Sequence, residues 1–438
     1  MILLPALIYN YIIEEIDMRY IFSLAIILFI GLVAKAQTTK EEMTSDLNKT
    51  GGVYFAYPAT EADNTPAPSG FEPFHISHYG RHGSRYLISD NDYFSVASLL
   101  HKADSMKALS QKGSILKDRL DSLLIETAGR GGDLSPLGRR QHRAIAKRMF
   151  ENYPEVFADS SYITARSTLV PRCILSMTSF MESLKEQNPS LNIDFESSNR
   201  YMIYLCHSTK ESDEFNGKKG WWKESYRKFK DRHTKPDRLV ASIFNDDDFI
   251  DRYVDPHEFI WSLYWLASDA QNTEGKIDFY EFLTPDELFD LWQSFNAVFY
   301  AQHADFAPAE GVHVQNAANL IRNIIETADI AISSDKPSAA LRFGHDGNII
   351  PLATFLGLDG STAVIENPED FYKGWCDWKV APMAANIQMI FYRSPEYKDR
   401  VLVKVLHNEK ETHIPVKTDI WPYYDWKDVK SFLESKMK

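Results

Sequence analysis

Strand-like runs near both ends of this 438-residue chain each stop at a small or charged residue, and helix starts follow. FHISHY (74–79), SYITARS (161–167) and ALRFGHD (340–346) are bulky or alternating, as β-strands are. In LSPLGRRQHRAIAKRMF, Ser135 and Pro136 occupy the preferred cap and first helical positions. This alternation predicts an α/β domain at the two ends of the chain.

The middle of the chain has a different pattern. Residues 205–325 are rich in aromatic and charged side chains, and LTPDELFDLW opens a helix with a capping box of Thr284 and Glu287. The pattern predicts a mainly α-helical cap over 205–325, inserted into an α/β domain made of 71–204 and 326–438. Residues 37–70 are polar and proline-bearing, and they predict an extended lead-in.

The amino-acid composition of the chain limits the classes of partner that it is expected to bind. The chain is 44% hydrophobic and 25% charged, which is typical of a globular protein, and its formal net charge is −13. An acidic surface makes nucleic acid an unexpected partner, so an anionic substrate would need a local basic pocket. The cysteines, Cys173, Cys206 and Cys376, have no metal-ligand spacing, and their odd number leaves at least one free thiol.

The N-terminus resembles an export signal. Met18 and Arg19 begin a short basic segment, and residues 20–33 form an apolar run. Residues 34–36 (Ala-Lys-Ala) have small side chains at the two positions that a signal peptidase recognises. We expect cleavage before Gln37 and translation from Met18, since the preceding residues are acidic. The alternative is a permanent N-terminal anchor, although the apolar run is short for a membrane span.

The stretch SHYGRHGSRY (77–86) predicts an anion site. Arg81 and Arg85 flank His82, so their charge should oppose protonation of its imidazole at neutral pH. The preceding strand places this group at a carboxyl end, where open α/β sheets bind ligands. Arginine forks match phosphate oxygens, so we expect His82 to be a neutral nucleophile facing an anion.

A metal site is the alternative for the same histidines. His75, His78 and His82 would have to face one point. Glycines at 80 and 83 interrupt a helix here, and on a strand His75 and His78 point to opposite faces. We therefore expect no metal, and we expect His78 to be packed within the strand.

Two further strand ends carry matching chemistry. Arg166 lies at the end of SYITARS, and His345 and Asp346 follow the third strand and Gly344. A histidine can hold a phosphoryl oxygen, and a carboxyl group can give a proton to a leaving oxygen.

With these motifs together, the chain resembles the histidine phosphatase superfamily in its acid phosphatase and phytase branch. RHGSRY matches the Arg-His-Gly-x-Arg signature, although Leu87 stands where proline is common. LSPLGRRQ resembles the Leu-Thr-x-x-Gly-x-x-Gln segment, and ARSTLVPRCILSMTSFMESL resembles the block that supplies the third pocket arginine. FGHDGNIIPL, APMAANI and VLHNEK are similar to multiple inositol polyphosphate phosphatases in particular. The resemblance implies a three-layer α/β/α fold of the phosphoglycerate mutase type with a helical cap.

The distal motif departs from the inositol phosphatase pattern, which is His-Ala-Glu. Here His345 and Asp346 are followed by Gly347, so the motif has the His-Asp form of many phytases and acid phosphatases. The first phosphate attacked on a polyphosphate is therefore not defined by the resemblance.

The resemblance also implies roles. His82 attacks phosphorus and Asp346 protonates the leaving alcohol. The non-bridging oxygens are held by Arg81, Arg85, Arg166 and His345. No cofactor or metal is implied.

The expected function is exported hydrolysis of inositol polyphosphates, phytate included, through a phosphohistidine. The alternatives are a broad acid phosphatase or sugar-phosphate phosphatase and, outside enzymes, an inactive phosphate-binding protein. The expected partner is a small phosphorylated substrate, with no membrane contact after signal cleavage. KKGWWK (218–223) is a weaker candidate for substrate contact, and the favoured alternative is a solvated helix face with buried tryptophans.

Overall fold

The computed structural model describes residues 38–58, 62–159, 161–206, 208–217, 220 and 222–437. The chain divides into two compact units, 1–45 and 46–438. The described part of the first unit is helix α2 (Thr39–Ser45). The predicted signal segment lies outside the described residues, as do residues 218, 219 and 221 of KKGWWK.

The second unit is built on one β-sheet. Its strand order is β3-β2-β4-β1-β5-β6-β7, and β8 pairs with β6. Strands β3, β2, β4 and β1 are parallel to one another. Strand β5 pairs antiparallel with β1, and β6 pairs antiparallel with β5. The parallel strands therefore bring their carboxyl ends to one edge. The strand bounds are β1 (Glu72–Arg81), β2 (Tyr162–Ser167), β3 (Asn192–Ser197), β4 (Ser338–Gly344), β5 (Asn386–Arg393), β6 (Val401–His407), β7 (Lys410–Glu411) and β8 (Tyr423–Asp425).

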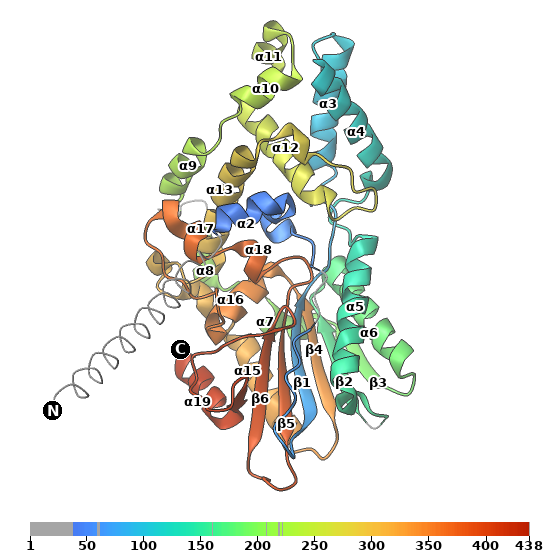
Figure 1. Cartoon of the computed structure of the whole chain (residues 1–438), viewed down its shortest axis with the longest axis vertical. Helices are drawn as coiled ribbons and strands as arrows, with labels where there is room; N and C mark the ends of the chain where they lie inside the picture. Colours follow the sequence, from blue (N-terminus) through green and yellow to red (C-terminus); the bar gives the residue numbers. More distant parts are fainter. Residues whose placement is uncertain are drawn as a thin grey trace, which may run out of the picture. The chain divides into compact units, whose positions relative to one another are not determined.

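Helices cover both faces of the sheet (Figure 1). Helices α5 (Pro136–Asn152) and α6 (Pro171–Gln187) contribute to the core on one face, whereas α15 (Ala318–Ile332), α16 (Asp346–Leu356) and α19 (Trp426–Lys436) contribute to the core on the other. Strand β5 alternates between the two cores: Met389 and Phe391 belong to one, and Ile390 and Tyr392 to the other. The predicted three-layer α/β/α class is confirmed.

The remaining long helices form a layer that we call the helical cap. Within it, α3 packs against α12 and α4 against α10, and Leu109 bridges to Phe244 through its backbone. The cap therefore includes residues 91–127 as well as helices of the predicted insertion. The cap helices are α3 (Asn91–Ser105), α4 (Gln111–Thr127), α9 (Lys223–Arg232), α10 (Asp237–Ile243), α11 (Asp247–Tyr253), α12 (Pro256–Ala270) and α13 (Pro285–His303). Shorter helices are α7 (Met202–Leu205), α8 (Lys210–Asn216), α14 (Val312–Gln315), α17 (Phe371–Gly374) and α18 (Asp377–Val380).

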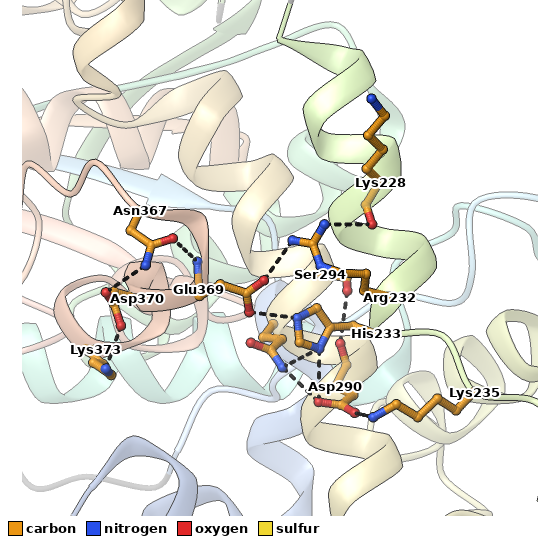
Figure 2. A network of polar contacts seen from close by, with 11 residues as sticks. Lys228, Arg232, His233, Lys235, Asp290, Ser294, Asn367, Glu369, Asp370 and Lys373 are labelled. Atoms are coloured by element: carbon orange, nitrogen blue, oxygen red, sulfur yellow. Dashed lines mark hydrogen bonds and ion pairs between the residues drawn. The ribbon is translucent and has the colours of Figure 1, made fainter.

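A polar network joins the cap to the segment that precedes α17 (Figure 2). The ring of His233, directly after α9, lies with Nδ1 3.2 Å from an Asp290 oxygen and Nε2 2.9 Å from a Glu369 oxygen. Arg232 donates to Glu369 at 2.8 Å, and Lys235 donates to Asp290 at 3.0 Å. These contacts connect α9 and α13 to a segment far away in the sequence.

The lead-in is only partly extended, which corrects the prediction. Besides α2, residues Leu47–Tyr54 form the 3₁₀ helix η1, whose first turn is capped by the Asp46 carboxylate accepting from Asn48 N–H at 3.2 Å. Val53 and Tyr54 are buried, and η1 packs against α12 and α13. Tertiary burial therefore outweighs the polar composition of this segment.

Candidate active site

The loop that follows β1 holds His82 in a fixed position. The His82 N–H donates to Gly344 O at 2.9 Å, and its carbonyl accepts from Ala384 N–H at 2.9 Å. The imidazole Nδ1 lies 2.9 Å from its neighbour's carbonyl oxygen, Gly83 O, so Nδ1 carries the hydrogen. The Nε2 atom then keeps its lone pair, as a nucleophile requires.

His82 is neutral. Burial lowers the pKa of its imidazole well below the usual value, and the charges of Arg81, Arg172 and Arg85 lower it further. The sequence prediction of an uncharged histidine among arginines follows the same physical reasoning.

The loop that carries His82 packs directly against the first turn of α5. A Cβ on Gly83 would lie 2.5 Å from the carbonyl oxygen of Gly138, and a Cβ on Gly138 would lie 2.3 Å from that of Ser84. Neither position has space for a side chain. The glycine of the LSPLG motif is thus required for this close approach.

A buried hydrogen-bond chain holds the same loop from the side of the cap. Gln141 accepts from Ser84 N–H at 2.8 Å and donates to Ser84 Oγ at 2.9 Å. The Ser84 hydroxyl donates to Asn272 at 2.6 Å, and Asn272 donates to the carbonyl of Tyr54 at 2.9 Å. The LSPLGRRQ motif pointed to Gln141, but no local signal identified Asn272 or Tyr54.

The guanidinium groups of Arg81 and Arg85 are both buried in this site. Arg81 donates to Val53 O at 2.5 Å and to Ala381 O at 2.7 Å. Arg85 donates to the carbonyl of Tyr86 at 2.8 Å and to the hydroxyl of Tyr54 at 3.2 Å. These bonds leave the Nε atom of each arginine buried and without a partner.

Arg172 supplies a third guanidinium. It lies in the first turn of α6, and its Nε is also buried without a partner. Burial lowers the pKa of Arg172, the charge of Arg85 lowers it further, and Asp346 acts in the opposite direction. Arg172 therefore lies within electrostatic reach of both residues.

The structure does not bring Arg166 to this group. Its guanidinium donates to Asp194 on β3, at 2.7 Å to the carbonyl and 2.6 Å to the carboxylate, and it lies 4.8 Å from the ring of Tyr201. Successive strand residues face opposite sides, and Ile163 and Ala165 face the core that α6 covers, so Arg166 points away from α6. Arg172, rather than Arg166, adds its positive charge to that of the arginines around His82.

His345 and Asp346 come from the end of β4. The His345 ring is centred 5.8 Å from that of His82, and its Nε2 lies 3.2 Å from Thr168 Oγ1. An Asp346 oxygen lies 2.8 Å from Arg81 Nη2. Burial raises the pKa of Asp346, but the positive charges around it, Arg81 above all, hold the pKa well below its usual range.

The other two histidines of the β1 stretch are structural. His75 lies with Nδ1 2.8 Å from Ser338 Oγ, and His78 packs against Phe180 and Phe343. Burial lowers the pKa of both to about 3. Within the described ranges, no cluster of three His, Cys, Asp or Glu side chains has metal-binding geometry. Cys173, Cys206 and Cys376 are free thiols.

Buried arginines around a histidine of low pKa, at the carboxyl edge of an α/β sheet, are an arrangement that suits a phosphatase. The chain matches the histidine phosphatase superfamily (branch 2) over residues 80–408. It belongs to that family, as its motifs predicted. No curated protein sequence matches it.

Solved structures share the fold at low sequence identity. The Bifidobacterium longum multiple inositol polyphosphate phosphatase, in complex with inositol hexasulfate, has 18% identity and a TM-score of 0.75 over 89% of this chain and 98% of its own. The phytase from D. castellii has 14% identity and a TM-score of 0.67, over 89% and 85%. The Hafnia alvei phytase with myo-inositol hexakis sulphate has 13% identity and a TM-score of 0.51, over 85% and 98%.

None of the helices in the described part of the chain is long and apolar enough to cross a membrane.

Proposed function

We propose that this phosphatase hydrolyses phosphomonoesters through a phosphohistidine on His82, with inositol polyphosphates, phytate included, as substrates. The observation that carries the proposal is the convergence of Arg81, Arg85 and Arg172 on a neutral imidazole. Each of these arginines keeps a buried Nε without a partner. Buried polar groups are normally satisfied, so this arrangement favours an anion with several acceptor oxygens.

In the first step, the arginines and His345 hold the non-bridging oxygens and neutralise the charge that develops on them. The lone pair of His82 Nε2 forms a bond to phosphorus as the bond to the ester oxygen breaks. The departing oxygen takes the electron pair and a proton from Asp346. The products are the free alcohol and a phosphorylated His82.

The ionised state of Asp346 constrains how the proton arrives. In the free site, Arg81 holds the pKa of this carboxyl low, so it carries no proton at neutral pH. A bound phosphate places negative charge beside the carboxyl and competes for Arg81, and both effects raise the pKa of Asp346. A substrate that binds as its monoanion brings the required proton with it.

In the second step, water attacks the phosphorus of the phosphohistidine. Asp346, now ionised, accepts a proton from this water, and the electron pair of the N–P bond returns to His82. Inorganic phosphate leaves, and the proton on Asp346 is available for release or for the next turnover.

The substrate class has support from two directions. Resemblance at 340–410 is to inositol polyphosphate phosphatases, and the titles of two matching structures name inositol hexasulfate and myo-inositol hexakis sulphate as their ligands. A broad acid phosphatase is the second candidate, because Asp346 has the form found in that group. An inactive phosphate-binding protein would have no need of a proton donor beside the pocket.

We also propose export, supported by the signal-like composition of residues 18–36. N-terminal sequencing of the native protein should begin at Gln37, or be blocked there by cyclisation. A retained apolar segment in the membrane fraction would contradict export.

The central experiment compares His82→Ala with His101→Ala. His101 is a half-exposed surface histidine paired with Asp121, so its loss controls for nonspecific effects. Incubation with a panel of phosphate esters should show turnover abolished only in His82→Ala. A rapid acid-free quench should also trap labelled phosphate on the wild type and on His101→Ala, but not on His82→Ala. Substantial turnover by His82→Ala would refute the mechanism.

A further inference from the structure

Two consecutive residues at the end of η1 contact the two arginines that flank His82. The Val53 carbonyl accepts from Arg81 at 2.5 Å, and the Tyr54 hydroxyl accepts from Arg85 Nη2 at 3.2 Å. The guanidinium carbon of Arg85 also lies 4.7 Å from the centre of the Tyr54 ring. The contact to Arg81 comes from the backbone, whereas those to Arg85 come from a side chain and depend on which residue stands at position 54.

Tyr54 completes a set of contacts that hold the head group of Arg85. Arg85 Nη1 donates to the carbonyl of Tyr86 at 2.8 Å, while Nη2 donates to Tyr54. Nε is buried and has no partner among the described residues. These bonds use one N–H at each Nη, so the Nε–H and the second N–H of each Nη are left for an anion. The guanidinium is therefore held on its Nη side and is free to bind on the other.

The position of Tyr54 is itself fixed by distant parts of the chain. Tyr54 is 8% exposed, and its carbonyl accepts from Asn272, directly after the cap helix α12, at 2.9 Å. The N–H of the preceding residue, Val53, donates to the carboxylate of Asp377 on α18 at 3.1 Å. The Tyr54 hydroxyl thus has a defined place relative to Arg85 before any substrate arrives.

We propose that Tyr54 is a positioning residue, which holds the guanidinium of Arg85 in the orientation that binds the phosphoryl group. This inference rests on the proposed phosphatase reaction and adds a residue of the lead-in to it. An arginine side chain has many rotamers, and ordering it at the moment of binding costs affinity. Because Tyr54 orders Arg85 in the free site, this cost is not incurred when phosphate binds.

Tyr54→Phe removes the hydroxyl acceptor and keeps the ring, so it tests the hydrogen bond alone. Loss of this bond should weaken competitive inhibition by inorganic phosphate roughly fivefold, and it should lower kcat/KM for nitrophenyl phosphate by a similar factor. Tyr54→Leu removes the ring as well as the hydroxyl, and both losses should be larger. Thermal unfolding of each variant shows that it is folded under the assay conditions.

The decisive measurement is a double-mutant cycle, because a positioning residue acts only through the group that it positions. Arg85→Ala should lower kcat/KM for nitrophenyl phosphate more than Tyr54→Phe does. In the Arg85→Ala background, Tyr54→Phe should change kcat/KM by less than about twofold. Losses that multiply would show that the hydroxyl acts independently of Arg85, and they would overturn the inference.

Tyr57→Phe is the matched control, since it removes a hydroxyl from the same segment. The Tyr57 hydroxyl donates to Glu409 at 2.9 Å and accepts from Asn386 at 3.1 Å, so its bonds are made to neither of the arginines that flank His82. Tyr57→Phe should lower the Tm and leave phosphate inhibition unchanged. Equal weakening of phosphate inhibition in Tyr54→Phe and Tyr57→Phe would mean a general loosening of the segment and would contradict the specific role of Tyr54.

The outcomes for the inference and for the proposed function are distinguishable. Unchanged phosphate inhibition in both folded variants of Tyr54 would overturn the inference while leaving the phosphatase proposal standing. A wild type that hydrolyses no ester and that shows no phosphate binding by calorimetry would overturn the proposed function, and the role of Tyr54 with it.

Discussion

Replacing Arg172 and Arg166 in parallel tests which arginine belongs to the phosphate pocket. Arg172 has a buried Nε without a partner and lies within electrostatic reach of Arg85, whereas Arg166 is paired with Asp194 at 2.6 Å. The two residues are six positions apart and flank the same helix start, so the variants form a matched pair.

The expected effects differ in kind. A hydrogen bond to a charged group contributes about 1.5–3 kcal/mol, so Arg172→Ala should weaken inhibition by inorganic phosphate by roughly 10- to 150-fold. Its Tm should be unchanged or higher, because the substitution removes a buried cation next to Arg85. Arg166→Ala should lose no more than about 1 kcal/mol of stability, the range for a partly exposed ion pair, and should keep its phosphate affinity.

The assay is competitive inhibition by phosphate and by vanadate, with thermal unfolding of each variant in the same buffer. Arg172→Lys adds a further comparison, because it keeps the charge but loses the planar fork, and should give an intermediate inhibition constant. Normal phosphate inhibition in Arg172→Ala, together with a large loss in Arg166→Ala, would refute the placement and restore the sequence-based assignment.

Two further predictions concern carboxyl groups. Asp346→Asn keeps the shape of the side chain but removes the acid. The inositol alcohol of phytate is a poor leaving group, so turnover of phytate should fall by about 10²–10⁴-fold, whereas the burst of phosphohistidine from nitrophenyl phosphate should fall far less. Equal losses in the phosphohistidine bursts from phytate and from nitrophenyl phosphate would exclude Asp346 as the acid. Asp269 is buried and accepts from Tyr93 at 2.5 Å, and burial raises its pKa from 3.8 to about 7. The folded state therefore binds this proton more tightly than the unfolded state, and the resulting stability is complete below about pH 4 and is lost as pH rises to about 7. Denaturant unfolding of wild type and Asp269→Asn should show the wild type losing up to roughly 4 kcal/mol relative to the variant between pH 4 and 8; parallel pH profiles would contradict the raised pKa.

Helix-capping and strand patterns in the sequence were sufficient to predict the helices and strands that position the candidate site. Ser135 caps α5 by accepting from Gly138 N–H, and Thr284 and Glu287 form the predicted capping box of α13. Strands β2 and β4 lie where their apolar patterns placed them. These features depend on residues within one turn or one strand, so the sequence is informative about them.

Only the candidate site residues that directly follow a predicted strand could be located from the sequence. His82, Arg81 and Arg85 lie in one short loop after β1, and His345 and Asp346 lie directly after β4. Parallel pairing of β1 with β4, which aligns Arg81 with Gly344, brings these two groups together. The sequence therefore located them as soon as both runs were recognised as strands.

Only the tertiary structure distinguished Arg172 from Arg166. Both are arginines near the end of β2. The side chain of Arg166 points towards Asp194 on the neighbouring strand β3, whereas Arg172, in the first turn of α6, lies within electrostatic reach of Arg85. Side-chain direction depends on which face of β2 is covered by α6, and this is a property of the packed layers.

The contacts from distant segments were decided in the same way. Tyr54 belongs to a segment predicted to be extended, and Asn272 follows α12 in the cap, yet both reach the loop of His82 through Ser84 and Arg85. Their roles arise from burial and hydrogen bonding between residues 31 to 218 positions apart, which no local pattern records. The sequence by itself determined the family and supplied the proposed nucleophile and acid, whereas packing determined which other side chains surround them.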